Sequence, residues 1–528
     1  MPLDPATLLQ ILTALAVSWG RMGAALLLSI AFAVVVGVAA GVNPLLEKII
    51  IPVLDLLQSI PILSFFPLAL YAFTIIHPII GPELAALFLI FTSQAWNIAF
   101  GVYESMRVLP GELLEASRVL GLGSARRLLS LYLPAAFPRI VDNIPASWSN
   151  GLYFLVASEI ITLGEKQVTL FGIGSLSASF IASGRFLELG VSIVSVAAAV
   201  ILTNAFFFLP LMRLSERYRF EYTAAEVPRV WMEKPIRPLV HAVRDLFSRL
   251  TLPGYRAFSK AFQSLSEKLR TRLSQVWIAL AVAGIAVAFY LLAFSGGASN
   301  IQRLLEGFGR LGLHVFPMLG FSVARVLIAI LLALGWTLPL ALLVYSRRRL
   351  EPIVIPFLQV GSSIPATLLA PLVMTLSADF GLPLEFGAIM IILLGIQWYL
   401  FFLIYGGLRA VPVEEEEVCR VFRIRGLSKL RHLYLPRIFP SLVTGLLVAM
   451  GGGWNTLIIA ERLVIDSEVW EVEGPGIGKE ISLAVSVGDI PLLVAATIWM
   501  AVFIVILNRF LWRRLYEVAV ESVGGKVL

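Results

Sequence analysis

The sequence predicts an all-α membrane protein with about 11 transmembrane helices, arranged as two copies of one unit. Three observations lead to this fold class. Of the 528 residues, 59% are hydrophobic and only 14% are charged, which is more apolar surface than a soluble protein of this size can bury. Eleven apolar runs are long enough to cross ~30 Å of hydrocarbon. Segments of the first half also recur about 302 residues later.

The apolar runs are bounded by charged residues, proline or glycine, and they divide into five in the first half and six in the second. We expect crossings near 16–42, 52–76, 84–104, 139–163 and 189–212, and then near 276–295, 316–346, 353–377, 385–405, 440–462 and 490–511. Two of these runs should contain broken helices. Pro61 and Pro67 fall inside one run, and Pro365 and Pro371 fall inside its counterpart.

The internal repeat is clearest in a polar segment that lies between apolar runs in each half. EASRVLGLGSARRLLSLYLP (115–134) aligns with EVCRVFRIRGLSKLRHLYLP (417–436), and at the same offset Trp96, Pro138 and Glu159 meet Trp398, Pro440 and Glu461. A repeat of this length implies two copies of one five-helix unit. Each polar segment should form a short helix, a turn and a second helix that ends at the proline.

The distribution of charge sets the expected orientation in the membrane. Residues 213–275 hold 13 Lys and Arg against 6 Asp and Glu, and both polar segments are also basic. Basic segments are retained on the cytoplasmic side. Residues 462–489 hold two basic and six acidic residues and belong outside. We expect the first apolar run to be retained in the mature protein, because no Lys or Arg precedes Arg21.

These patterns divide the chain into two units and a linker. The first unit spans 1–212 with five helices and a polar loop at 107–139, the linker spans 213–275, and the second unit spans 276–528 with six helices and a polar loop at 409–437. The linker should form basic amphipathic helices along the inner leaflet, with a solvated tether as the alternative. The helix near 276–295 has no counterpart in the first half. This extra crossing makes the two repeats parallel, with the N-terminus outside and the C-terminus cytoplasmic.

The polar segments resemble the cytoplasmic loop of the membrane permeases of ATP-driven importers, which reads Glu-Ala-Ala, three residues, Gly, nine residues, Ile, one residue, Leu-Pro. The resemblance implies two type I importer permease units, whose loops form coupling helices that dock into the ATPase. The residues that would couple to the ATPase are Glu115, Ala116, Ser117, Gly121, Leu133 and Pro134 in the first loop, and Glu417, Gly426, Leu435 and Pro436 in the second. Because Arg423 stands where the first loop has Gly121, we expect the second loop to turn differently, at Gly426.

The segments GGGWNTLIIAERL and GPGIGKEISLAVSVGDIP resemble the branch of these permeases that imports nitrate, taurine, alkanesulfonates and similar oxyanions. The matching residues are Trp454, Ala460-Glu461 and Gly476-Ile477-Gly478, with a looser copy at Trp148, Ser158-Glu159 and Gly172-Ile173-Gly174. The resemblance implies a dimer of ABC ATPase subunits, which binds ATP and Mg, and an extracytoplasmic solute-binding protein as partners. It also implies an inner-membrane location. Fused permeases for iron or thiamine remain the alternative at the level of the substrate.

The candidate pathway residues are polar or ionisable groups near the outer ends of the crossings, namely Asn455, Thr456, Glu159 and Glu461. A carboxylate would repel an oxyanion. We therefore expect Glu461 to be paired or hydrogen-bonded beside the Gly-Ile-Gly turn, and a glutamine there to retain transport. Asn455 and Thr456 would supply neutral hydrogen bonds to the solute.

Basic residues near the outer ends of the crossings have simpler expected roles. The sequence offers Lys166 and Arg462 as partners for the two glutamates. Arg21 and Arg325 begin equivalent helices, and we expect both to snorkel to the outer interface.

Other function classes find little support in the sequence. The chain has no G-x-x-x-x-G-K-[ST] segment, so a separate subunit must supply the ATPase, and we expect no enzymatic activity and no cofactor bound by this chain. A single cysteine, Cys419, and four scattered histidines suggest neither a disulfide nor a metal site. An ion-coupled secondary transporter, the other alternative, would need a carboxylate or histidine relay near the midplane. No nucleic-acid partner is expected.

Overall fold

The computed structural model describes residues 4–515 except for 60, 161–169, 216–217, 219–297, 363, 410, 466–467, 508–509 and 512–513. The described chain is almost entirely helical, and the sheet within it is a two-stranded hairpin. Seven of its helical stretches are long and apolar enough to cross a membrane. The predicted crossing near 276–295 and almost all of the predicted linker lie outside the described residues. The count of about 11 helices therefore stays a prediction.

The first half begins with a long helix that is capped at its start, where the side chain of Asp4 accepts a hydrogen bond from the backbone N–H of Ala6. The helices of this half are α1 (Pro5–Val42), α2 (Pro44–Ser59), α3 (Ile62–Ile76), α4 (Gly81–Arg107), α5 (Gly111–Val119), α6 (Ser124–Arg127), α7 (Leu133–Ile160), α8 (Ile173–Ala182), α9 (Phe186–Thr203) and α10 (Leu209–Ser215). Two π-helical turns, Leu128–Tyr132 and Asn204–Phe208, lie before α7 and before α10.

Among the described residues, the second half repeats this order, with an amphipathic helix before it and a hairpin within it. Its elements are α13 (Ala298–Leu311), a 3-10 turn (Gly312–His314), α14 (Val315–Ser346), α15 (Glu351–Ser362), α16 (Ala366–Asp379), α17 (Leu384–Arg409), α18 (Val413–Val421), α19 (Gly426–Lys429), a π-helical turn (Leu430–Tyr434), α20 (Leu435–Glu461), β1 (Arg462–Ile465), β2 (Glu468–Glu471), α21 (Ile477–Val487) and α22 (Ile490–Leu507). The antiparallel hairpin, in which Arg462 pairs with Glu471, was not predicted from the sequence.

Small residues form the seam on which each half is built. Helix α1 packs against α4, and α14 packs against α17 in the same way. The buried residues along these seams are Ser18, Ala25, Ser29, Ala33 and Gly37 in α1, and Ser322, Ala329, Ala333, Thr337 and Ala341 in α14. At Gly37 a Cβ atom would lie 2.7 Å from the Cβ of Val102, so only glycine permits this approach. Close backbone packing of this kind is typical of helices in membranes.

The predicted helix breaks are present, and each occurs at one of the two prolines in its run. The chain leaves α2 before Pro61 and α15 before Pro365, while Pro67 and Pro371 lie inside α3 and α16. The prediction that the polar segments end at a proline is wrong. A π-helical turn carries the chain directly into α7 and α20, which contain Pro134 and Pro436 near their first residues. Because the helix is continuous here, the missing proline N–H removes one backbone hydrogen bond, and the wider π turn makes room for the ring.

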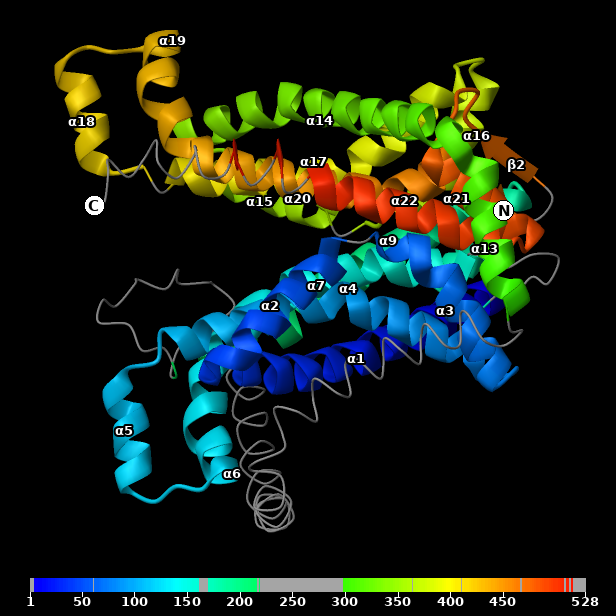
Figure 1. The fold of residues 1–528 in the computed structure, drawn as a ribbon. Helices are drawn as coiled ribbons and strands as arrows, with labels where there is room; N and C mark the ends of the chain where they lie inside the picture. The colour runs from blue at the N-terminus through cyan, green and yellow to red at the C-terminus, as the bar shows by residue number, and fades with distance from the viewer. Residues whose placement is uncertain are drawn as a thin grey trace.

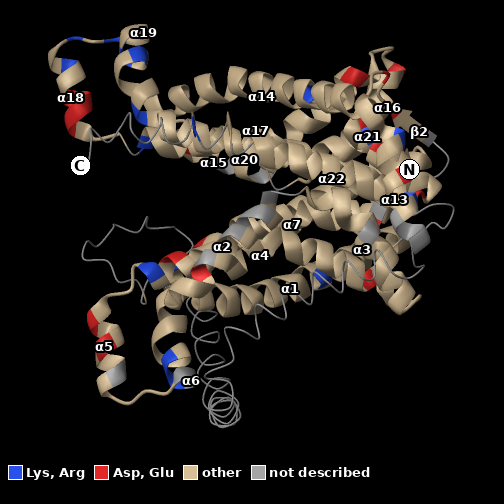
Figure 2. Ribbon diagram, in the orientation of Figure 1, with Lys and Arg blue, Asp and Glu red and all other residues tan. Residues whose placement is uncertain are grey.

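The two halves contact each other away from the polar loops and diverge toward them, and both polar loops project from the same end of the bundle (Figure 1). The start of α1 lies at the opposite end, together with the hairpin and α13. Charged residues gather at these two ends, whereas the long helices between them carry few (Figure 2). A continuous apolar core joins the halves, because Leu63, Phe66 and Phe154 of the first half pack into the core of the second.

Candidate coupling and translocation sites

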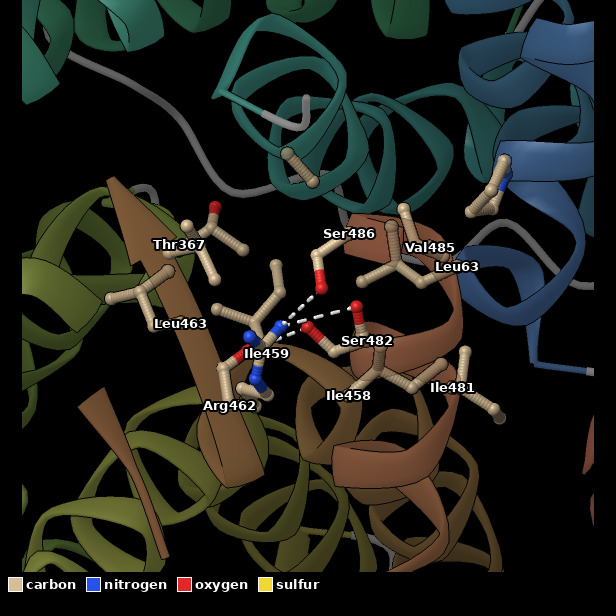
Figure 3. Close-up of a pocket in the computed structure, with 13 residues that line it drawn as sticks. Leu63, Thr367, Ile458, Ile459, Arg462, Leu463, Ile481, Ser482, Val485 and Ser486 are labelled. Atoms are coloured by element: carbon tan, nitrogen blue, oxygen red, sulfur yellow. Dashed lines mark hydrogen bonds between the residues drawn. The ribbon is translucent and has the colours of Figure 1, made fainter. Parts of the chain in front are cut away.

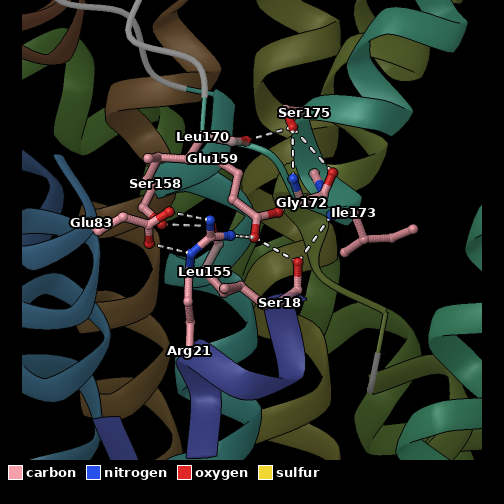
Figure 4. Close-up of polar contacts among 11 residues, drawn as sticks. Ser18, Arg21, Glu83, Leu155, Ser158, Glu159, Leu170, Gly172, Ile173 and Ser175 are labelled. Carbon is pink, nitrogen blue, oxygen red and sulfur yellow. Dashed lines mark hydrogen bonds and ion pairs between the residues drawn. The ribbon is translucent and has the colours of Figure 1, made fainter. Parts of the chain in front are cut away.

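A buried ion cluster ties α1, α4, α7 and α8 together at the end of the first half that lies opposite the polar loops (Figure 4). Arg21 of α1, only 6% exposed, lies between two glutamates. Its Nε and Nη2 donate to the two carboxylate oxygens of Glu83 at 2.7 and 2.6 Å, and its Nη1 donates to Glu159 at 2.7 Å. Such a bidentate pair is among the stronger ionic contacts in proteins.

Glu159, which is fully buried at the end of α7, also closes the start of α8. Its Oε1 accepts from the hydroxyl of Ser18 at 2.6 Å, and its Oε2 accepts from the backbone N–H of Gly174 at 2.7 Å. The Ser18 hydroxyl in turn accepts from the N–H of Ile173 at 3.0 Å. The carboxylate thus sits on the first turn of α8, where free N–H groups and the helix dipole favour negative charge.

The glycines of the Gly-Ile-Gly segments make this approach possible. A Cβ atom at Gly172 would lie 2.1 Å from Oε1 of Glu159, and one at Gly476 would lie 2.2 Å from Oε2 of Glu461. Atoms cannot approach so closely, so any side chain at these positions displaces the carboxylate. The motif is therefore explained by packing around a buried glutamate.

The second half repeats the cluster, with the backbone N–H of Lys479 in place of that of Gly174 as donor to the buried glutamate, and adds two contacts. Arg325 binds Glu385 through two hydrogen bonds of 2.6 and 2.7 Å and binds Glu461 through one of 2.6 Å, while Ser322 donates to Glu461 at 2.6 Å. The additional contacts join Arg325 to the carbonyl of Pro475 and Glu385 to the N–H of Gly474. The second cluster is therefore more closely tied to the loop before α21.

Two expectations from the sequence change here. The snorkelling of Arg21 and Arg325 is wrong: both are buried, at 6% and 3% exposure, because a glutamate on each side compensates the charge. The pairing of Glu461 is confirmed, but its partner is Arg325, and the partner of Glu159 is Arg21. Arg462 instead pairs with Glu471, and Lys166 lies outside the described residues. Because the partners lie about 136 residues apart, sequence proximity pointed to the wrong ones.

Polar contacts also cross between the halves, and Asn455 makes one of them. Its Oδ1 accepts from the N–H of Ile62 at 2.7 Å, and so caps α3 just after the helix break. The equivalent position in the first half, Tyr153, offers its carbonyl to the hydroxyl of Thr367 at the start of α16, at 3.2 Å. Thr456 is buried and donates to its own helix at Gly452. The two broken helices are thus held reciprocally by the opposite half.

Of the loop residues singled out from the sequence, Glu115, Ala116, Ser117 and Glu417 lie on two short helices, α5 and α18, that project from the bundle (Figure 1). Gly121 and Gly426 follow these helices, and the leucines and prolines lie at the starts of α7 and α20. Glu115, Ala116 and Glu417 are exposed, as are Gly121, Gly426 and Pro436, whereas Ser117 is buried and Leu133, Pro134 and Leu435 are half-buried. Apolar side chains are also exposed at matching places. Val119 and Leu120 are 87% and 74% exposed, and their counterparts Val421 and Phe422 are 76% and 72% exposed.

The turns after α5 and α18 have the same backbone conformation. Gly121 has φ of 63°, and Arg423 at the equivalent position has φ of 56°. The same long hydrogen bond closes each turn, from Leu122 N to Ser117 O at 3.0 Å and from Ile424 N to Cys419 O at 2.8 Å. The expectation that the second loop turns differently is therefore wrong. Gly426 adds a further left-handed residue, with φ of 57°, rather than replacing Arg423.

The second loop is held to the bundle by a polar contact that has no counterpart among the described side chains of the first loop. The carboxylate of Glu416 accepts hydrogen bonds from the hydroxyls of Tyr345 and Tyr434, at 2.9 and 3.1 Å, and lies 3.7 Å from Lys429. Burial raises the pKa of Glu416, but the two tyrosine hydrogen bonds and the lysine charge outweigh it and hold that pKa below its usual range. The first loop has Leu114 at this position, and it packs into the apolar core.

Comparison with known proteins identifies the architecture. Residues 5–219 and 325–518 each match the family described as the binding-protein-dependent transport system inner membrane component. The chain belongs to this family. It is therefore a transmembrane permease of an ABC importer, and the two matched regions confirm the internal repeat.

Several known permeases resemble this permease in sequence. It is 29% identical over 136 residues to the bicarbonate transport system permease protein CmpB of Synechococcus elongatus, which is 26% of this chain and 47% of that protein. It is 27% identical over 191 residues to the nitrate import permease protein NrtB of Leptolyngbya laminosa, covering 36% and 64%. It is 27% identical over 188 residues to the taurine transport system permease protein TauC of Escherichia coli, covering 36% and 63%. The permease thus spans about half to two thirds of the length of these relatives.

Proposed function

We propose that this permease forms the translocation path for a small oxyanion, such as nitrate, bicarbonate, taurine or a sulfonate, and couples it to separate ATPase subunits. The observation that carries the proposal is the placement of two matching loops, both tipped with exposed apolar residues, at one end of a duplicated helix bundle. Exposed apolar patches rimmed by charge are typical of protein interfaces. The partner that fits both is a dimer of ABC ATPase subunits, which hydrolyses ATP with Mg.

The orientation follows from charge. Both polar loops hold more Lys and Arg than Asp and Glu, so the loop end faces the cytoplasm. The start of α1 then lies outside, where an extracytoplasmic binding protein delivers the solute. Because both loops leave the same end, the repeats are parallel. An odd number of crossings, such as the one predicted near 276–295, would account for this and would place the C-terminus in the cytoplasm.

The pathway runs between the halves, where the broken helices meet the opposite unit. Asn455 and Thr456 lie at this junction, and Asn455 offers a neutral amide there. Glu159 and Glu461 act on the pathway indirectly, since each is fully buried and hydrogen-bonded and holds the outer helices in place.

The proposal is tested by uptake of labelled nitrate, bicarbonate and taurine into proteoliposomes that contain the permease and its ATPase, with the binding protein outside. We expect ATP-dependent uptake of at least one of these anions. Asn455→Leu should reduce uptake severalfold, because it leaves the N–H of Ile62 without its partner. Thr444→Val is the matched control, since Thr444 donates to Pro440 within the same helix. Uptake of iron or thiamine, but of no anion, would overturn the proposed substrate class.

A further inference from the structure

A small pocket lies at the outer end of the bundle, where the two halves meet (Figure 3). Its volume is about 70 Å³, and it is lined by Leu63, Pro67 and Ala157 from the first half and by residues of α16, α20, β1 and α21 from the second. One water requires about 10–15 Å³ of such volume. The pocket therefore has room for an ion of a few heavy atoms, or for the charged head of a longer one.

One cation lines this pocket. Arg462, which is 8% exposed, directs its Nη1 toward α21, where it donates to the carbonyl of Ser482 at 3.2 Å and to the hydroxyl of Ser486 at 3.1 Å (Figure 3). Its Nε donates to Glu471 at 3.2 Å. Glu471 is 43% exposed and also lies 3.4 Å from Lys479, so water and a second cation share its charge. The positive charge of Arg462 is thus only partly compensated.

The position of Arg462 lies outside the repeated framework. At the offset that aligns Glu159 with Glu461, the first half has Ile160, so the framework does not require a cation here. The hydroxyls of Ser482 and Ser486 lie one turn apart on α21, and Thr367 lines the pocket from α16. Each of these hydroxyls donates to a carbonyl, Ser482 to Arg462, Ser486 to Leu483 and Thr367 to Tyr153, so a serine hydroxyl would have to turn from its carbonyl toward a bound anion. The other walls are largely aliphatic. Nε and Nη1 of Arg462 are bonded to protein groups, which leaves Nη2 as the guanidinium nitrogen for an oxyanion.

We propose that this pocket is a binding site for a small oxyanion, held by Arg462 with the hydroxyls of Ser482 and Ser486 as it enters from outside. Because residues from both halves line the pocket, a movement of the halves relative to each other would change its shape and release the ion inward. The proposal rests on the proposed function and adds to it the residue that selects for negative charge. It differs from a purely structural role, in which Arg462 would only fasten the hairpin to α21.

The first experiment measures anion binding to the purified permease–ATPase complex, using nitrate as the probe. Nitrate should raise the midpoint of thermal unfolding relative to the same concentration of chloride. Arg462→Gln should abolish most of this shift, Arg462→Lys should keep part of it, and Arg185→Gln should leave it intact. Arg185 is the matched control, since it forms an exposed ion pair with Glu188 in the first half. An equal nitrate shift in Arg462→Gln would overturn the site.

The second experiment compares uptake with ATP hydrolysis in proteoliposomes that also receive the binding protein. Losing one charged hydrogen-bond donor should lower nitrate uptake per ATP by about tenfold in Arg462→Gln, while ATPase stimulation by the binding protein persists. A parallel fall in uptake and ATPase activity would show that Arg462 is a structural anchor and would overturn the inference. Wild-type complex that hydrolyses ATP but imports no anion would overturn the proposed function together with the site. Normal anion uptake in both wild type and Arg462→Gln would overturn the site alone.

Discussion

The two halves of this permease agree closely at the ends opposite the polar loops and differ at the loops themselves. Each of these ends contains the same Ser-Arg-Glu-Glu cluster with hydrogen bonds of nearly equal length, although the aligned sequences around it have few identities. The polar loops share a backbone conformation, yet Gly121 is replaced by Arg423 and Leu114 by Glu416. A buried charge tolerates little change, because every partner must remain in place. An exposed turn accepts a different side chain at modest cost.

The largest effect should follow from removing the central arginine of a cluster. Arg325→Met leaves two glutamates facing each other, one of them fully buried, and such a loss typically costs about 3–5 kcal/mol. We expect little folded protein, as measured by thermal unfolding and by size-exclusion chromatography in detergent. Arg21→Met should be damaging but somewhat less so, because its cluster lacks the contacts to Pro475 and Gly474.

A compensating variant tells charge apart from packing in these clusters. Adding Glu159→Gln to Arg21→Met removes the buried unpaired charge, so stability should recover in part. If the double variant is no more stable than Arg21→Met, the arginine stabilises the cluster through its packing and not through its charge.

Glu461→Gln alone should lower stability and transport more than the sequence suggested. Glu461 accepts from Ser322 and Arg325 at one oxygen and from the N–H of Lys479 at the other, and glutamine has only one side-chain oxygen with which to accept.

The second prediction concerns the glycines beside the clusters. Gly172→Ala and Gly476→Ala each place a Cβ atom on a buried carboxylate, and overpacking of this kind costs about 1–3 kcal/mol. Both should lower the midpoint of thermal unfolding by similar amounts, because the Cβ atoms would lie 2.1 and 2.2 Å from the carboxylate oxygens. Gly190→Ala is the control: no heavy atom lies within 4 Å of its Cβ position, so it should be neutral or stabilising. A loss in only one half would mean that the two glycines are not equivalent.

The sequence predicted the repeat, the helix breaks and the polar loops, because each leaves a local signal in composition, proline or motif. It could not predict the ion clusters, since Arg21, Glu83 and Glu159 are far apart in the chain and meet only through helix packing. The register of the repeat did contain a clue. Arg21 and Arg325 align, as do the four glutamates, and ionisable residues repeated inside apolar crossings imply a partner. The strand hairpin left no such signal, because its strands have only four residues each.

The third prediction concerns the polar fastening of the second loop. Glu416→Leu copies the first half and removes the acceptor for Tyr345 and Tyr434, so the segment around α18 should open more readily, by about 1 kcal/mol. Hydrogen exchange of α18 amides in the purified complex measures this, with α5 amides as the internal reference. Lowering the pH should also make the segment around α18 open more readily. Because the pKa of Glu416 is lowered in the folded protein, its contribution is complete above about pH 4.3, the ordinary glutamate pKa, and is lost as the pH falls through the lower folded value. Unchanged exchange in Glu416→Leu would show that packing alone holds the loop.

The smallest effect should come from exchanging the residues at the two turns. Among the described residues, Arg423 is the one non-glycine residue with positive φ, and this conformation costs a non-glycine residue about 1–2 kcal/mol. Arg423→Gly should therefore leave transport-linked ATP hydrolysis intact and stabilise slightly, because the relief of strain is partly offset by the flexibility of glycine when unfolded.

Two substitutions at Gly121 distinguish backbone strain from a side-chain contact with the ATPase. No heavy atom lies within 4 Å of the Cβ position, so a side chain meets only the backbone penalty. Gly121→Asn should be nearly normal, since asparagine tolerates this region, whereas Gly121→Val should reduce ATP hydrolysis severalfold because a β-branched residue does not. ATPase activity of the reconstituted complex, compared with the thermal midpoint of each variant, tests this order. If Gly121→Asn is as damaging as Gly121→Val while its thermal midpoint is unchanged, the added side chain collides with the ATPase. The first loop would then be the more closely docked of the two. The side chain of Arg423 would indicate that the second loop leaves more space between its turn and the ATPase.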